Sequence, residues 1–350
     1  MTPQGVSSTD ACMKAVKLFA VRQLETVVVS IPKPAAGEVL IKVGATGVCG
    51  SDLSTYLGLH PYKRPPAVLG HEFAGVVVQV GAEVKDVDIG DRVCAAAFSG
   101  CGACLACRQK KPQLCRHKTT FSTDGWMGSF AEFVIAKQNM LYRVPEHVTF
   151  TAAALVEPLS IGVHAVRLAG DLANKSVTII GAGNIGLCCA VAARQLGAAR
   201  ITCIDQNAEK ETLAKECGAD AFITATADRS HLSITKSGAD ITIVACDYQT
   251  ALEDAIALSL PGGRIVIVSY SSRATTVDMN QLVRAELCIS GSALADPSDF
   301  QTVIEWIADG RLDPLFLVTH QMPLSSAGDA LSLMERGLGC IGKIMLSPSA

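Results

Sequence analysis

Apolar residues are spaced differently in the first and second halves of the chain. Between Lys14 and about Thr149 they occur in short β-type runs separated by glycine and proline. Examples of these runs are Glu38–Val43, Phe73–Val80 and Phe130–Ile135. Short runs divided by turn residues predict the strands of a β-rich, barrel-like domain.

After Thr149 the pattern becomes helical and then alternates. The alanine-rich segment Thr151–Gly170 predicts a helix with Thr151 as its N-cap and Gly170 as its stop. Strands and helices then alternate, with predicted elements Ser176–Ile180, Ile185–Leu196, Arg200–Ile204, Ala208–Cys217, Ala239–Ala245, Thr250–Leu258 and Arg264–Ser269. Near-continuous apolar strands predict an α/β domain with a parallel sheet covered on both faces.

The last part of the chain predicts one further helix, Ser298–Ala308, and a final strand near Lys343–Leu346. This tail could return to the first domain, and the hydrophobic pattern alone leaves that open.

Composition fits two globular domains and excludes some classes of partner. The 350 residues are 49% hydrophobic and 18% charged, with a formal net charge of -3. A weakly acidic chain lacks the basic footprint of a nucleic-acid binder. Residues 1–13 do not have the pattern of a secretory signal, and the apolar runs are too short for a membrane span. We therefore expect a cytoplasmic protein whose 14 cysteines are thiols or metal ligands.

The segment SVTIIGAGNIG at 176–186 is a dinucleotide-binding candidate, because a strand runs into G-x-G-x-x-G and then into a helix. The first glycine permits a tight turn, the second lets the backbone approach a pyrophosphate, and the third allows close helix–strand packing. The candidate turn residues are Gly181, Gly183, Asn184, Ile185 and Gly186.

Asp205 ends the next predicted strand, about 20 residues beyond the turn, where a carboxylate can hold both ribose hydroxyls. A 2′-phosphate would meet its negative charge, and no arginine follows in Gln206 and Asn207. The sequence therefore favours NAD over NADP.

A loop at 100–115 carries four closely spaced cysteines, Cys101, Cys104, Cys107 and Cys115. Four thiolates can close a tetrahedral zinc site. Such a site has no open position, so the predicted zinc is structural. An iron–sulfur cluster is the alternative.

Three further segments carry ligand-type residues, namely GVCGSD at 47–52, GHE at 70–72 and VEP at 156–158. Each alone is weak. In order with the four-cysteine loop, GSFAEFV, LVEPLSIGVHA and GAGNIG, they resemble the zinc-dependent medium-chain dehydrogenases, closest to the sorbitol dehydrogenase-like polyol branch. The resemblance extends from Lys14 to Leu346.

The resemblance implies a GroES-like catalytic domain formed by residues 1–158 and 297–350, and a Rossmann dinucleotide-binding domain at 159–296. It also implies a catalytic zinc in addition to the structural one, with Cys49 and His71 as direct ligands. Glu72 and Glu157 would complete the zinc shell, with the direct ligand of the two left open.

The remaining implied roles concern protons and phosphates. Asp52 would orient His71, Ser51 would receive the substrate proton, and Lys343 would lie near the cofactor phosphates. The implied reaction is hydride transfer between NAD and a secondary alcohol or ketone, of the polyol, diol or sugar-alcohol type. The implied assembly is a homodimer or homotetramer, and Glu286–Ser290 is a candidate pairing edge.

The sequence departs from the family at two informative positions. A histidine that serves many relatives as the last proton acceptor is replaced by Ser54, with His60 as a weak substitute. The arginine of the polyol branch is replaced by Leu294. Phe121, Trp126 and Tyr56 could reach the substrate pocket, although core packing is the more ordinary role for each.

These departures keep two other function classes open. A non-catalytic NAD-binding sensor or scaffold would retain the fold without turnover. A zinc-ribbon nucleic-acid binder would use the four-cysteine loop, but it would need a basic face that the composition does not offer.

Overall fold

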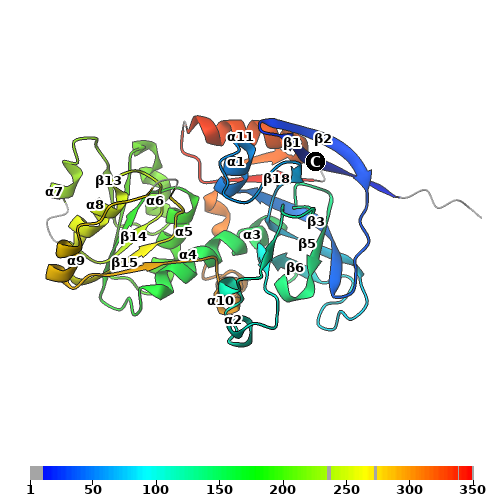
Figure 1. Ribbon diagram of the computed structural model, residues 1–350, viewed down its shortest axis with the longest axis horizontal. Helices are drawn as coiled ribbons and strands as arrows, with labels where there is room; N and C mark the ends of the chain where they lie inside the picture. Colours follow the sequence, from blue (N-terminus) through cyan, green and yellow to red (C-terminus); the bar gives the residue numbers. More distant parts are fainter. Residues whose placement is uncertain (1–10, 235–237, 272–273, 338, 349–350) are drawn as a thin grey trace, which may run out of the picture.

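The computed structural model describes residues 11–234, 238–271, 274–337 and 339–348. Figure 1 shows a β-rich part, coloured blue to cyan, beside a part in which green and yellow helices flank a sheet. This division is the one that the hydrophobic pattern predicts.

The β-rich part contains a three-stranded sheet and a seven-stranded sheet. The first has the order β2-β1-β4, and the second has the order β10-β6-β5-β3-β18-β17 with β9 also pairing with β3. The strands are β1 (Cys12–Ala20), β2 (Gln23–Ser30), β3 (Glu38–Val48), β4 (Ala67–Val68), β5 (Glu72–Val80), β6 (Arg92–Ala95), β9 (Phe133–Lys137), β10 (Leu141–Arg143), β17 (Val318–Pro323) and β18 (Lys343–Ser347).

Two short strands and several helices accompany these sheets. The strands β7 (Phe98–Ser99) and β8 (Thr119–Thr120) form a small separate sheet beside the four-cysteine loop. The helices of this part are α1 (Gly50–Tyr56), α2 (Leu105–Arg108), α3 (Phe150–Ala154) and α11 (Ala327–Arg336).

The second part is a six-stranded sheet with the order β13-β12-β11-β14-β15-β16, and all its pairs are parallel. Its strands are β11 (Ser176–Ile180), β12 (Arg200–Asp205), β13 (Ala221–Thr224), β14 (Ala239–Val244), β15 (Ser259–Ile267) and β16 (Cys288–Gly291). Its helices are α4 (Val156–Leu168), α5 (Asn184–Gln195), α6 (Glu211–Glu216), α7 (His231–Ile234), α8 (Ala251–Leu258), α9 (Met279–Ala285) and α10 (Pro297–Ala308). The strand order reverses at β11, where a doubly wound fold places its ligand.

The predicted helix Thr151–Gly170 is two helices, since α3 ends before Leu155 and α4 begins after it. The N-cap is Thr149 rather than Thr151, because the Thr149 side chain accepts a hydrogen bond from the Ala152 amide at 3.2 Å. The predicted domain boundary after residue 158 falls within α4, so that boundary stays a prediction.

The helices α4 and α5 cross closely beside the dinucleotide turn. A Cβ at Gly162 of α4 would lie 2.6 Å from the Cys188 backbone of α5. No side chain fits at that distance, so Gly162 permits the crossing. The catalytic carboxylate candidate Glu157 is thereby held on a helix that packs directly on the nucleotide-binding helix.

The C-terminal segment returns to the first part, because β18 pairs antiparallel with β3. Figure 1 shows the red strand β18 beside the blue strand β3. On the way back, α10 is fixed to α4 by Asp299, which contacts His164 Nδ1 at 2.7 Å and Arg167 at 2.8 Å. Within the described ranges, no helix is long and apolar enough to cross a membrane.

Candidate active site and metal centres

Cys49 lies where β3 ends and α1 begins. It is the N-cap residue of α1, and its amide donates to Asp52 Oδ2 at 3.0 Å. His71 and Glu72 lie at the start of β5, which pairs with β3 so that Gly47 faces Glu72. Strand pairing therefore brings together residues that are separated in sequence.

The side chains of Cys49, His71 and Glu72 form a group whose possible ligand atoms all lie within 4.8 Å of one another. A thiol, an imidazole and a carboxylate with one further position open are a suitable ligand set for catalytic zinc. Within the part of the chain that the structure describes, Glu72 Oε1 and Ser51 Oγ are buried without a hydrogen-bond partner. Unpartnered polar atoms are rare in protein interiors and here fit an occupant that the chain itself does not supply.

Asp52 supports this group from inside the protein. Its carboxylate is fully buried, accepts from the Gly70 amide at 3.1 Å and lies 3.7 Å from His71 Nδ1. Burial alone would raise the pKa of Asp52, but the charges of His71 and Lys63 lower it to about 2. An ionised Asp52 facing Nδ1 leaves the other ring nitrogen of His71 for a metal.

Glu157 is buried on α4 but is not a member of the three-residue group. Burial and the charge of Glu72 raise the pKa of Glu157 to about 7, against the opposing charges of His71 and Lys343. The structure therefore gathers Glu72 with Cys49 and His71, and leaves Glu157 as a nearby carboxyl.

Lys343 lies in the protein interior, and the position near the cofactor phosphates that the family resemblance implies stays a prediction. Its ammonium is buried and donates to Glu72 Oε2 at 2.6 Å and to the Val48 carbonyl at 3.3 Å. The reason is that β18 places Lys343 beside β3 in the interior, where a buried cation requires a buried anion.

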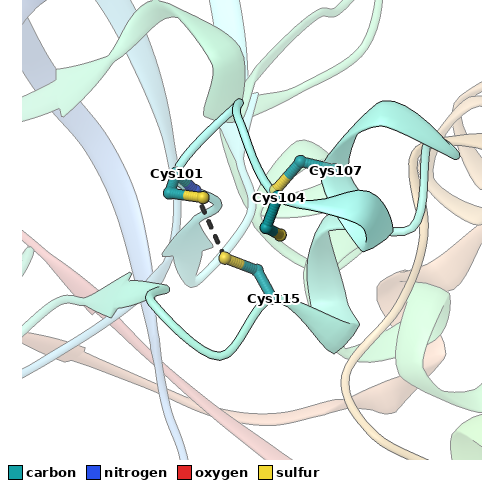
Figure 2. A group of neighbouring side chains, drawn as sticks. All are labelled: Cys101, Cys104, Cys107 and Cys115. Carbon is teal, nitrogen blue, oxygen red and sulfur yellow. Dashed lines mark hydrogen bonds between the residues drawn. The ribbon is translucent and has the colours of Figure 1, made fainter.

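The four cysteines of the loop at 100–115 form the second group. Their sulfur atoms all lie within 4.8 Å of one another. Figure 2 shows the four side chains gathered in this loop. Cys115 Sγ accepts hydrogen bonds from the amides of Cys101 at 3.4 Å and His117 at 3.3 Å. Four convergent sulfurs fit a closed, structural zinc site. The two groups together indicate two zinc ions per chain.

The glycine-rich turn lies between β11 and α5. Gly181 has a φ of 97°, which favours glycine, and Gly183 is the N-cap residue of α5. A Cβ on Gly186 would lie 1.8 Å from the Gly181 carbonyl oxygen, whereas a Cβ on Gly183 would contact nothing within 4 Å. The turn is therefore packed tightly on one side and open on the side where a pyrophosphate would sit. Asn184 and Ile185 begin α5, and the buried Asn184 Oδ1 has no hydrogen-bond partner.

The two glycines provide a matched test of this geometry. We expect Gly186→Ala to destabilise the protein, because its Cβ cannot be placed without moving the turn. We expect Gly183→Ala to unfold at nearly the wild-type temperature but to bind NAD at least about tenfold more weakly, because the new methyl group occupies the approach to the pyrophosphate. Thermal unfolding and NADH fluorescence titration measure the two effects. Equal losses of stability in both variants would contradict this assignment.

Asp205 lies at the end of β12, as predicted. Its carboxylate accepts from the amides of Ala182 at 2.7 Å and Asn207 at 2.9 Å. It lines a cavity of about 190 Å³ together with Gly181, Gln206 and Tyr248. Lys210 pairs with Asp205 at 3.1 Å, a contact that the sequence analysis missed because it considered only the two residues that follow Asp205.

The residues at which the chain departs from the family, and the aromatic residues considered for the pocket, lie in different parts of the structure. Ser54 Oγ donates to the Gly50 carbonyl at 3.0 Å. Phe121 is buried in a core cluster that includes Phe73, and the Trp126 ring packs on the Phe121 ring at 4.6 Å, so both have the ordinary role of core packing. Arg22 lies over the Tyr56 ring at 5.9 Å.

His60, the candidate substitute for the missing histidine, and Leu294, which replaces the family's arginine, lie in different environments. Burial and the charge of Lys63 lower the pKa of His60 to about 4, so this ring is a poor proton acceptor at neutral pH. Leu294 has a φ of 56° and packs against the large core cluster that contains Phe300. Lys63 itself, buried in the same loop as His60, is a charged residue that the sequence analysis did not single out.

Comparisons with known proteins agree with this geometry. Residues 35–146 match the family described as alcohol dehydrogenase GroES-like domain, and residues 184–309 match zinc-binding dehydrogenase. The starvation-sensing protein RspB of Escherichia coli strain K12 is 32% identical over 96% of this chain and 99% of its own length. Sorbitol dehydrogenase of Ovis aries is 33% identical over 91% of this chain and 92% of its own.

A solved structure shows the same fold over nearly its whole length. It is described as a short chain alcohol dehydrogenase (rspB) from E. coli CFT073 complexed with cofactor NADH. It has a TM-score of 0.89 and 30% identity, and the match covers 96% of this chain and 99% of that one. With its two zinc ligand groups and its dinucleotide turn, the chain belongs to the zinc-containing medium-chain dehydrogenase family and is a zinc-dependent NAD(P) alcohol dehydrogenase that acts on CH–OH groups.

Proposed function

We propose that this enzyme interconverts a secondary alcohol and a ketone with NAD, and that the substrate is a polyol, diol or sugar alcohol. The observation that carries the proposal is the convergence of Cys49, His71 and Glu72 beside buried polar atoms that have no partner. Similarity to a sorbitol dehydrogenase supports the polyol class. Bound zinc would supply a Lewis acid for the substrate oxygen.

Residues of the chain would hold the metal and move the proton of the substrate hydroxyl. Cys49, His71 and Glu72 would hold the metal, and Asp52 fixes the orientation of His71 by facing its Nδ1 atom. The buried Ser51 hydroxyl has no hydrogen-bond partner among the described residues, so it is available to relay the proton: it would accept the proton of the substrate hydroxyl as it gives its own to solvent water. Glu157 is a buried carboxyl near this group and would be a further polar contact for the metal.

Asp205 selects NAD in this proposal. Its carboxylate is oriented by two backbone amides and would hold the ribose hydroxyls. A 2′-phosphate would be repelled by Asp205, although Lys210 offsets part of that charge. Gly181, Gly183, Asn184, Ile185 and Gly186 form the pyrophosphate site.

A non-catalytic sensor is the second candidate, and the similarity to RspB, whose name describes starvation sensing, favours it. The two candidates differ in turnover. A sensor would bind NAD without oxidising any alcohol, whereas a dehydrogenase needs the Cys49–His71–Glu72 group.

A spectrophotometric screen tests the proposal. Protein with a measured zinc content is mixed with NAD or NADP and with a panel of diols, polyols, sugar phosphates and simple secondary alcohols. We expect reduction of NAD, at least about tenfold more efficiently than NADP, with a secondary alcohol of the polyol or diol type. NAD binding without turnover across the whole panel, in zinc-replete protein, would support the sensor instead.

The assembly is part of the same proposal. The strand β16 is at the edge of the parallel sheet and overlaps the predicted pairing segment Glu286–Ser290. An exposed strand edge can pair with a second copy of the chain, so a homodimer, or a homotetramer built from two dimers, is proposed.

A further inference from the structure

The loop between α1 and β4 carries two consecutive cations, Lys63 and Arg64, in different environments. Arg64 is exposed, and its guanidinium donates to carbonyls of its own loop, including those of Lys63 at 2.9 Å and Pro61 at 3.2 Å. Lys63 is 5% exposed. Its ammonium forms no hydrogen bond or ion pair with any part of the chain that the structure describes. Arg64 thus stabilises the loop through these hydrogen bonds, whereas the Lys63 ammonium makes no such contact within the described residues.

The Lys63 side chain is buried, and its ammonium is close to the candidate zinc site. It is near enough for its charge to act on Asp52, His71 and Glu157. Glu72 is paired with Lys343, Asp52 faces His71, and neither these carboxylates nor Glu157 forms an ion pair with Lys63 within the described residues. Since an unpaired charge at the end of a buried side chain is costly, the position of Lys63 is best explained by an anion that binds from outside the chain.

The rest of the loop offers hydrogen-bond donors and faces the second domain. His60 Nδ1 accepts from the Lys63 amide at 3.1 Å, so its neutral ring carries the proton on Nε2 and presents a donor. The loop is anchored on α1 by Ser54, whose carbonyl accepts from the amides of Leu59 at 2.8 Å and His60 at 3.1 Å. Tyr62, on the same loop, lies near Tyr270, which follows β15.

We propose that Lys63 binds an anionic group of the substrate, a phosphate ester or a carboxylate, while the secondary hydroxyl of the same molecule lies at Cys49, His71 and Glu72. The inference rests on the proposed function and narrows its substrate class to anionic polyol derivatives. His60 Nε2–H is a second donor to the same group. Charge-assisted hydrogen bonds of this kind are the strong ones, so the anion should contribute substantially to binding.

Matched substrate pairs test the inference in zinc-loaded enzyme with NAD. The pairs are sorbitol with sorbitol 6-phosphate, and an alditol with the corresponding aldonate, which separate phosphate from carboxylate. We expect kcat/KM to be at least about tenfold higher for the anion of one pair. Lys63→Met should reduce that preference by about tenfold or more, mainly through KM, and Lys63→Arg should retain most of it. The exposed Lys33→Met is the control and should leave the preference unchanged.

A binding measurement separates failure of this inference from failure of the proposed function. Inorganic phosphate is titrated calorimetrically into zinc-loaded protein saturated with NADH, which blocks the pyrophosphate site. Binding that Lys63→Met removes would support the anion site even if no alcohol were oxidised. Equal preference for neutral and anionic substrates in the wild type and in Lys63→Met, or phosphate binding that is the same in both, would overturn the inference.

Discussion

Replacing Cys49 with alanine should lower kcat by about a thousandfold or more and should remove one of two zinc ions per chain. The expected loss follows from the several kcal/mol that a Lewis acid contributes to stabilising charge in the transition state. The fold should survive, because Cys49 is only partly buried and lies at the start of a short helix rather than in a core cluster. Metal content by mass spectrometry and NAD reduction are measured on the same preparations.

The matched control for Cys49→Ala is Cys340→Ala, another partly buried cysteine outside both metal groups. It should keep both zinc ions and normal turnover. The assignment would fail if Cys49→Ala retained two zinc ions, or if it lost one and kept wild-type activity. Loss of both zinc ions with unfolding would instead place Cys49 in the structural core.

The second large effect is expected at Lys343. Lys343→Met leaves the buried Glu72 carboxylate without its partner, and breaking a buried ion pair on one side costs about 3–5 kcal/mol of stability. Urea unfolding, with chelator present in every sample so that zinc binding does not enter the comparison, measures this loss.

A double-mutant cycle isolates the pair. Glu72→Gln in the Lys343→Met background removes the unpaired charge, so the double variant should be more stable than Lys343→Met alone. If the two substitutions simply added, the contact between Lys343 and Glu72 would contribute little. In that case Lys343 would be free to serve the cofactor phosphates, as the family resemblance implies.

Features formed by neighbouring residues could be predicted from the sequence. The four cysteines lie within one loop, and the glycine turn joins one strand to the helix that follows it, so their spacing alone indicates their geometry. The parallel sheet followed from the near-continuous apolar strands. The Thr149 cap was missed because Thr149 and Thr151 are equally suitable residues, and only the backbone conformation at the helix start distinguishes them.

Features formed by distant residues could not be predicted from local pattern. Cys49 approaches Glu72 because β3 and β5 pair in one particular register, and the family resemblance rather than the residues suggested this. The contact between Lys343 and Glu72 was not predicted, because it forms only when β18 returns to β3 and encloses the ammonium. A lysine looks the same in the sequence whether its charge faces solvent, a carboxylate or a ligand.

The sequence by itself determined the two-part architecture, the four-sulfur site, the dinucleotide turn and the carboxylate of Asp205 at the end of the next strand. Each depends on backbone conformations and spacings within a few residues or one βαβ unit. Only the tertiary structure decided that Glu72 joins Cys49 and His71, that Lys343 neutralises Glu72, and that Lys63 is buried without a counter-charge among the described residues. These outcomes depend on which charges the packed chain brings together and removes from water, and that is a property of the whole fold.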